Sequence, residues 1–123
     1  MHDYIYYTKP NERQLAREWI EDRKNSTIKA SIDARLTKLS QEGLALLEGK
    51  ILVPIQETPN GRIVTDYYEL RHVGKKWRLA VYYERAKDVF VIIWGWRKDQ
   101  KVQERDVAKA LNLLDEYLST REE

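Results

Sequence analysis

The chain has 123 residues and a formal net charge of +2, and 42% of its residues are hydrophobic against 34% charged. This length suits one domain over residues 1–123 with its own hydrophobic core, and the composition is globular rather than disordered. Cysteine is absent and the two histidines are His2 and His72, which excludes disulfides and leaves few ligands for zinc or iron. We therefore expect neither a metal nor a cofactor.

The chain carries no sign of membrane insertion or export. No apolar run approaches the roughly 20 residues that span a bilayer. The first residues, Met1 to Tyr4, lack the basic and apolar regions of a signal peptide. We expect a cytoplasmic protein with no membrane partner.

Positive charge is concentrated in the second half of the chain. Residues 1–60 hold nine basic and nine acidic side chains, whereas residues 62–101 hold ten basic and five acidic ones. A basic stretch with interleaved aromatic residues is typical of a surface that binds a polyanion. A solvated sheet surface without a partner explains the charge equally well.

The first half of the chain predicts one strand and a helical hairpin. Residues 4–7 form a short aromatic and β-branched run that stops before Pro10. Apolar residues at helical spacing predict a helix over residues 12–24, and residues 25–27 supply the N-cap of a second helix that ends at Gly43. The buried stripe of this second helix is Ile28, Ile32, Leu36 and Leu39.

The second half predicts four strands and a final helix. Residues 51–53 suit an edge strand because Pro54 follows. Three further strands joined by short connections predict an antiparallel meander over 64–72, 76–84 and 88–96. The last of these is apolar on both faces, which predicts a central strand that is covered on each side.

The final helix is predicted over residues 103–118, with a stripe of Val107, Leu111, Leu114 and Leu118. The order β-α-α-β-β-β-β-α indicates an α+β fold. We expect the hairpin and the final helix to pack on a twisted, mainly antiparallel sheet of about four to five strands.

Alternation along two of these strands predicts which side chains share a face. Tyr67, Glu69 and Arg71 point one way, and so do Arg78, Ala80, Tyr82 and Glu84 in the next strand. A core on the opposite face would leave these arginines and tyrosines together in solvent, where they suit phosphates and unpaired bases. A cross-strand ion pair between Arg71 and Glu69 is the plainer interpretation.

The segment 94–98 places two indoles and two cations beside Gly95. A glycine there permits close approach of backbone or of a ligand. Trp94 is also suited to simple core packing.

Three segments together resemble the C-terminal half of the RelE/HigB-type toxins: Tyr-Glu-Leu-Arg at 68–71, the Trp-Arg-Leu-Ala-Val-Tyr-Tyr strand at 77–83, and Val-Ile-Ile-Trp-Gly-Trp-Arg-Lys at 91–98. The resemblance covers about residues 67–118 and implies a RelE-like fold. It further implies a toxin of a toxin–antitoxin pair, a metal-independent endoribonuclease that cleaves messenger RNA, often on the ribosome. The implied partners are a cognate antitoxin, mRNA and the ribosome, and DNA would not be a substrate because the reaction needs a ribose hydroxyl.

The resemblance implies roles for particular residues. By position, Arg71 matches the arginine that holds the scissile phosphate, Arg97 the basic residue that protonates the leaving group, and Lys98 its neighbouring support. The residues expected to bind RNA are Arg62, Arg78, Tyr82, Trp96 and Lys101.

One catalytic role has no clear candidate. Family members often carry lysines ahead of the Tyr-Glu-Leu-Arg motif, one of them a general base, but no lysine lies between Lys50 and Lys75. Glu57, Glu69 and His72 are possible bases. Two alternatives therefore remain open: a ParE-like toxin that acts on DNA gyrase by protein contact, and an inactive family member that only binds its partner.

Overall fold

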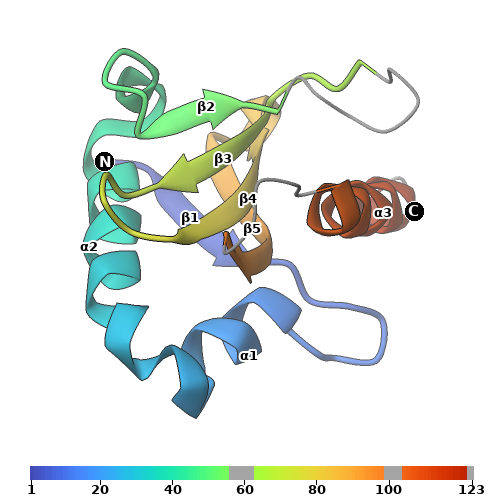
Figure 1. Cartoon of the computed structure of the whole chain (residues 1–123). Helices are drawn as coiled ribbons and strands as arrows, with labels where there is room; N and C mark the ends of the chain where they lie inside the picture. Colours follow the sequence, from blue (N-terminus) through green and yellow to red (C-terminus); the bar gives the residue numbers. More distant parts are fainter. Residues whose placement is uncertain (56–62, 99–103, 122–123) are drawn as a thin grey trace.

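The computed structural model of the chain is described over residues 1–55, 63–98 and 104–121 (Figure 1). Within these ranges the chain forms an α+β fold of three α-helices and five strands in the predicted order. The strands are β1 (Asp3–Tyr6), β2 (Leu52–Pro54), β3 (Tyr67–Arg71), β4 (Trp77–Glu84) and β5 (Val89–Arg97). The helices are α1 (Leu15–Glu21), α2 (Ser26–Glu42) and α3 (Glu104–Arg121), with 3-10 turns η1 (Arg23–Asn25), η2 (Gly43–Leu47) and η4 (Arg85–Lys87). No helix in the described ranges is long and apolar enough to cross a membrane.

The helical hairpin is confirmed, but α1 is shorter at both ends than the predicted range 12–24, and the predicted N-cap of α2 makes no capping bond. α1 ends at Glu21, earlier than predicted, because the Asp22 side chain accepts a hydrogen bond from the Lys24 amide and starts the η1 turn. Asn25 does occupy the N-cap position of α2, but its side chain makes no capping bond. It instead donates to the Trp19 carbonyl oxygen at 2.7 Å, tying η1 to α1. All four predicted stripe residues of α2 are buried, and Gly43 ends the helix with a positive φ of 55°.

The five strands form one mixed sheet in the order β1-β5-β4-β3-β2. β5 pairs parallel with β1 and antiparallel with β4, and the remaining pairs are antiparallel. The prediction that the most apolar strand is interior is confirmed, since β5 lies between β1 and β4. A bulge between Ala80 and Val81 shifts the register of β4 against β5, so that Ala80 faces Trp94 while Val81 faces Ile92.

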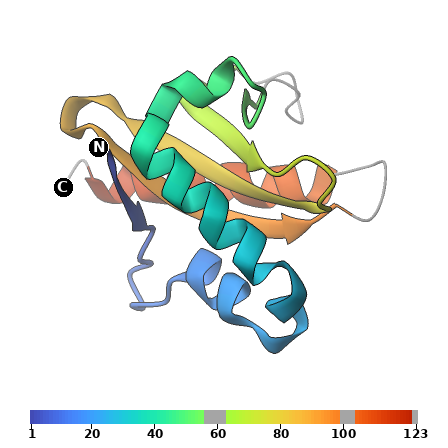
Figure 2. The same ribbon diagram turned by 90° about the vertical axis from the view of Figure 1, so that its left-hand side faces the viewer.

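Helices cover both faces of this sheet. Figure 1 shows α1 and α2 on one side and α3 on the other, and in Figure 2 α2 crosses in front of the strands while α3 lies behind them. Each face has its own apolar core. The hairpin-side core includes Ile32, Leu36, Trp77 and Phe90, and the α3-side core includes Tyr67, Val91 and Leu114.

The α3-side core corrects one expectation from the sequence. The face with Tyr67, Arg78, Ala80 and Tyr82 was expected to be open to solvent, but α3 packs on much of it. Tyr67 is fully buried there and its hydroxyl donates to the Ala110 carbonyl oxygen at 2.7 Å. The physical reason is the second apolar face of β5, which together with Tyr67 and Ala80 needs a cover that the stripe of α3 supplies.

Candidate functional site

Two arginines and one glutamate meet on the α3-facing side of the sheet, and we call Glu69, Arg71 and Arg78 the arginine cluster. Arg71 of β3 and Arg78 of β4 are directly opposite in the strand register, and Glu69 lies two residues before Arg71 on the same face. The Glu69 carboxylate lies between the guanidinium groups, with Oε1 3.5 Å from Arg78 Nε and Oε2 3.6 Å from Arg71 Nη2. The cluster carries two positive charges against one negative charge.

The polar atoms of the arginine cluster are enclosed but poorly bonded. The side chain of Arg78 is only 9% exposed and that of Arg71 is 31% exposed. Arg78 Nη1 donates to the Trp77 carbonyl oxygen at 2.8 Å, but Nε of both arginines and Glu69 Oε1 are buried without any hydrogen-bond partner among the described residues. Such orphaned groups cost about 1–3 kcal/mol each, and more when charged. The two Nε atoms lack acceptors, and Glu69 Oε1 lacks a donor.

The electrostatics of the arginine cluster also favour an anion. Burial lowers the pKa of Arg78, and repulsion from Arg71 lowers it further, while Glu69 acts in the opposite direction. Like charges directly opposite on neighbouring strands destabilise a sheet. A phosphate between the arginines would relieve this repulsion and accept bidentate hydrogen bonds.

Arg97, which the resemblance pairs with Arg71 in catalysis, does not join this cluster. Its register partner on β4 is Trp77, which belongs to the hairpin-side core, so Arg97 points to the face opposite Arg71. Its guanidinium donates from Nε to Asn25 Oδ1 at 2.9 Å and from Nη2 to the Lys24 carbonyl oxygen at 2.8 Å. In this structure Arg97 fastens η1 to the end of β5.

Two of the predicted RNA-binding aromatic residues are engaged by the protein itself. Trp96 is 3% exposed within the α3-side core, so its ring is not free to stack on a base as expected. Tyr82 is half-buried against the same core, and its ring lies 6.0 Å from that of Tyr117 on α3. Both result from the cover that α3 places over this face.

The other predicted residues are distributed as follows. Lys98 follows β5, and its amide donates to the Lys76 carbonyl oxygen at 2.9 Å, which closes the end of the β4–β5 pair. Lys98 is half-buried. Arg62 and Lys101, with the possible base Glu57, lie outside the described residues. His72 is half-buried, and its Nδ1 lies 2.9 Å from the Val73 carbonyl oxygen.

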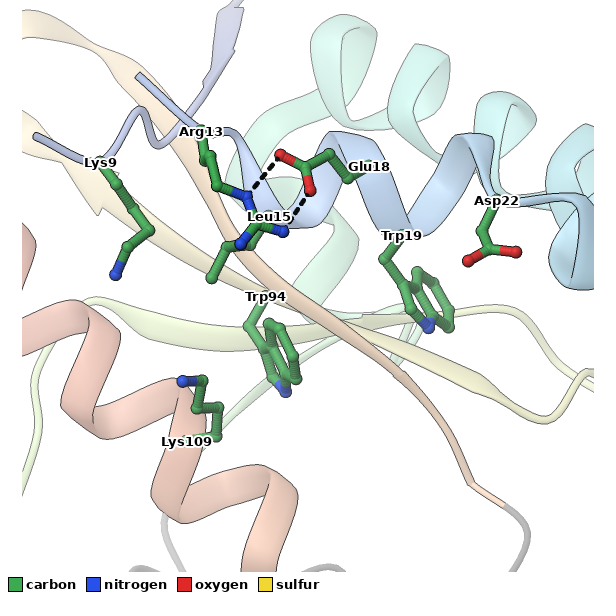
Figure 3. Close-up of a pocket in the computed structure, with 8 residues that line it drawn as sticks. All are labelled: Lys9, Arg13, Leu15, Glu18, Trp19, Asp22, Trp94 and Lys109. Atoms are coloured by element: carbon green, nitrogen blue, oxygen red, sulfur yellow. Dashed lines mark hydrogen bonds and ion pairs between the residues drawn. The ribbon is translucent and has the colours of Figure 1, made fainter. Parts of the chain in front are cut away.

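A second feature, which the sequence did not indicate, is an open groove of about 430 Å³ between α1, β5 and α3. We call it the Trp94 groove; its lining consists of Lys9, Arg13, Leu15, Glu18, Trp19, Asp22, Trp94 and Lys109 (Figure 3). Trp94 is half-buried, and its indole Nε1 has no hydrogen-bond partner among the described residues. Lys109 Nζ lies 5.8 Å from the centre of the Trp94 ring, within the range of a cation–π contact.

The absence of a side chain at Gly95 allows the Trp19 ring to line this groove. A side chain at position 95 would collide with the Trp19 ring and with Leu79, so the glycine allows the indole to lie directly on β5. The close approach predicted at Gly95 is therefore made by α1 rather than by a ligand. Among the described residues, no group of three or more His, Asp or Glu side chains gathers in a way that could hold a metal ion.

Comparison with known proteins adds no assignment. No model of a known protein family matches the chain, and no curated protein matches it. The functional argument accordingly depends on the arginine cluster and its surroundings.

Proposed function

We propose that the protein is a RelE-like toxin that cleaves RNA at the arginine cluster without a metal. The observation that supports this proposal is the pair of half-buried to buried arginines, Arg71 and Arg78, whose Nε atoms have no hydrogen-bond partner among the described residues and which share the single carboxylate of Glu69. A phosphodiester has the charge and the acceptor geometry that this pair lacks. The resemblance of residues 67–118 to the RelE/HigB toxins points to the same residues.

The proposed chemistry is an attack of the ribose 2′-hydroxyl on the adjacent phosphate. The attack forms a new P–O2′ bond and breaks the P–O5′ bond, and it leaves a 2′,3′-cyclic phosphate and a 5′-hydroxyl. Negative charge grows on the phosphorane in the transition state, where Arg71 and Arg78 stabilise it most strongly. Glu69 holds both guanidinium groups in place before the substrate arrives.

The reaction also needs two proton transfers, one from the 2′-hydroxyl to a base and one from an acid to the leaving 5′-oxygen. The positions of the described residues limit which side chains could act as this base and this acid. Arg97 is engaged with Asn25 and Lys24 on the other face, so we do not assign it to the leaving group. Glu69 and His72 are the described carboxylate and imidazole nearest in sequence to Arg71, and Glu69 alone belongs to the arginine cluster. On the ribosome, groups of the ribosome itself would share this work.

A toxin of this kind is held inactive by an antitoxin. The charge of the arginine cluster favours an acidic antitoxin segment that places carboxylates where the phosphate would bind. We expect such a segment to cover Arg71 and Arg78. Growth inhibition in cells and its relief by a partner gene would follow from this arrangement.

A ParE-like protein that blocks gyrase by contact is the second candidate. The separation of Arg71 from Arg97 favours this candidate. A nuclease of the RelE type would need a group that protonates the leaving oxygen, and Arg97, which was expected to do this, does not lie on the same face as Arg71. In that case the arginine cluster would bind an acidic surface and no RNA would be cut.

One experiment separates these functions. Purified protein is added to a translated message, and cleavage is mapped by primer extension for the wild type and for Arg71→Ala. The nuclease predicts cuts by the wild type alone, with cyclic phosphate ends, and on free RNA these cuts persist in EDTA. Intact RNA together with inhibited DNA supercoiling would establish the ParE-like function instead.

A further inference from the structure

The Trp94 groove has walls suited to a flat ligand. Trp19 and Trp94 present two partly exposed indoles on opposite elements, α1 and β5, and Leu15 adds apolar surface beside them (Figure 3). A volume of about 430 Å³ lies within the range of pockets that take small ligands. Both indole rings are only partly buried, so their faces offer apolar surface to a ligand in the groove.

The charges around this groove favour an anionic ligand. The two acids of the lining are already engaged, Glu18 by Arg13 at 2.6 Å and Asp22 by the Lys24 amide at 3.0 Å. Lys9 is bound to Glu116 at 3.0 Å. Lys109 lies over the Trp94 ring and is near enough to Glu116 to lower the pKa of that carboxyl group. The lining as a whole carries three basic side chains, Lys9, Arg13 and Lys109, against these two acids, a formal surplus of one positive charge.

The Trp94 wall of the groove shares a sheet face with the arginine cluster, whereas Trp19 packs against the hairpin-side core. Trp94 is the register partner of Ala80, and Ala80 is the register partner of Glu69. Residues aligned across neighbouring strands point to the same side, and strands are about 4.8 Å apart, so the Cα atoms of Trp94 and Glu69 lie about 10 Å apart. One polymer with charged and flat groups at short intervals could occupy both places.

From these observations we propose that the Trp94 groove binds one unpaired nucleotide of single-stranded RNA, its base against the indoles and its phosphate beside Lys109. Bases stack on aromatic side chains without a strict sequence requirement. The assignment rests on the proposed RNA substrate of the arginine cluster and adds a binding subsite to it.

Tryptophan fluorescence provides a direct test, because Trp77 and Trp96 are 0% and 3% exposed and a ligand in the groove would quench Trp19 and Trp94 alone. The probe is a short single-stranded RNA with 2′-O-methyl riboses, which cannot be cut by attack of the 2′-hydroxyl. We expect saturable quenching by this RNA. Trp94→Leu should weaken binding of a labelled copy about 5- to 150-fold, the usual effect of losing one base stack. Lys109→Glu, on the exposed side of α3, tests the same site without touching a core residue.

The controls separate failure of the subsite from failure of the proposed function. Lys38→Gln changes a cation on α2, on the other side of the sheet, and should leave RNA binding unchanged. Unchanged affinity in both Trp94→Leu and Lys109→Glu would overturn the subsite, whether or not unmethylated RNA is cleaved. So would binding of an acidic peptide at the groove with no binding of RNA. If the wild type does not cleave unmethylated RNA but its tryptophan fluorescence is still quenched by the methylated RNA, the nuclease proposal is wrong and the nucleotide-binding site is supported.

Discussion

Among the described residues, most buried polar side-chain atoms without a hydrogen-bond partner lie on the α3 side of the sheet. On the hairpin side, Trp77 Nε1 donates to Ser31 Oγ at 2.9 Å, and Asn25 and Arg97 satisfy each other. On the α3 side, the buried atoms without partners belong to Glu69, Arg71, Arg78 and Trp94. Of the five such side-chain atoms in the described ranges, only Arg35 Nε lies elsewhere, on α2.

This contrast indicates which face is structural and which is functional. Buried polar groups in proteins are almost always hydrogen-bonded, and exceptions need an explanation. A binding site is one such explanation, since its donors are kept for a ligand at some cost in stability. On this interpretation we expect the binding sites on the α3 side.

The largest effect on stability is expected at Arg97. Arg97→Ala removes two hydrogen bonds from a charged donor and leaves Asn25, which is 0% exposed, with an orphaned acceptor. We expect the free energy of unfolding to fall by about 1.5–3 kcal/mol in urea denaturation. Arg85→Ala, at an exposed ion pair with Asp66, serves as the control and should have a much smaller effect. If the free energy of unfolding falls equally in Arg97→Ala and Arg85→Ala, the hydrogen bonds of Arg97 do not stabilise the fold more than an exposed ion pair does.

Gly95→Ala tests the contact between α1 and β5. The added methyl group would collide with the Trp19 ring and with Leu79, so the hairpin must shift. We expect a loss of about 1–3 kcal/mol in the free energy of unfolding, typical of overpacking. Gly49→Ala, where only Ile51 comes near, should cost less. A fully stable Gly95→Ala protein would show that the hairpin does not rest directly on β5.

A smaller effect concerns the arginine cluster without any RNA. Inorganic phosphate at ten times its Kd should stabilise the wild type by about 1.4 kcal/mol in thermal unfolding at matched ionic strength, because it binds the folded state alone. Arg78→Ala should abolish this gain, since it removes half of the pair. The same gain in both proteins would place the phosphate elsewhere and weaken the contrast between the two faces.

The smallest effect is a pH dependence of the free energy of unfolding. It comes from the contacts of Tyr7 and Lys9, in the N-terminal segment, with Glu116 of α3. The hydrogen bond from Tyr7 at 2.6 Å, with a further one from Lys9, lowers the pKa of Glu116 below its ordinary value. A lowered pKa in the folded state adds stability above the ordinary pKa of a glutamate, about 4.5, and this stability is lost as the pH falls through the folded value. Between pH 6 and pH 3 the wild type should therefore lose more stability than Glu116→Gln. If the stability of the two proteins falls equally with pH, the contacts of Glu116 with Tyr7 and Lys9 do not contribute to stability.

The sequence predicted the order of elements because periodicity and turn residues are local signals. Ile28, Ile32, Leu36 and Leu39 at helical spacing, and β5 apolar on both faces, required no knowledge of distant contacts. The resemblance also directed attention to Arg71 and Arg78, which the register does bring together.

Arg97 lies on the opposite face of the sheet from Arg71, which the resemblance did not indicate. Trp96 and Arg97 are consecutive in a strand and must point to opposite faces, so they could not both serve the substrate of Arg71. This alternation was a usable signal. The Trp94 groove had no such signal, because Trp19, Trp94 and Lys109 come from α1, β5 and α3 and meet only through packing.

The most direct test of the functional face compares Arg71→Ala with Arg97→Ala in single-turnover cleavage of an RNA that the wild type cuts, under conditions where both variants are folded. If the arginine cluster stabilises the phosphorane, Arg71→Ala should raise the barrier by about 2–4 kcal/mol, a rate loss of roughly 30- to 900-fold, with little change in the free energy of unfolding. Arg97→Ala should be less stable yet cleave at close to the wild-type rate. The reverse pattern, in which Arg97→Ala is inactive and Arg71→Ala cleaves normally, would contradict the assignment of catalysis to the α3 side of the sheet.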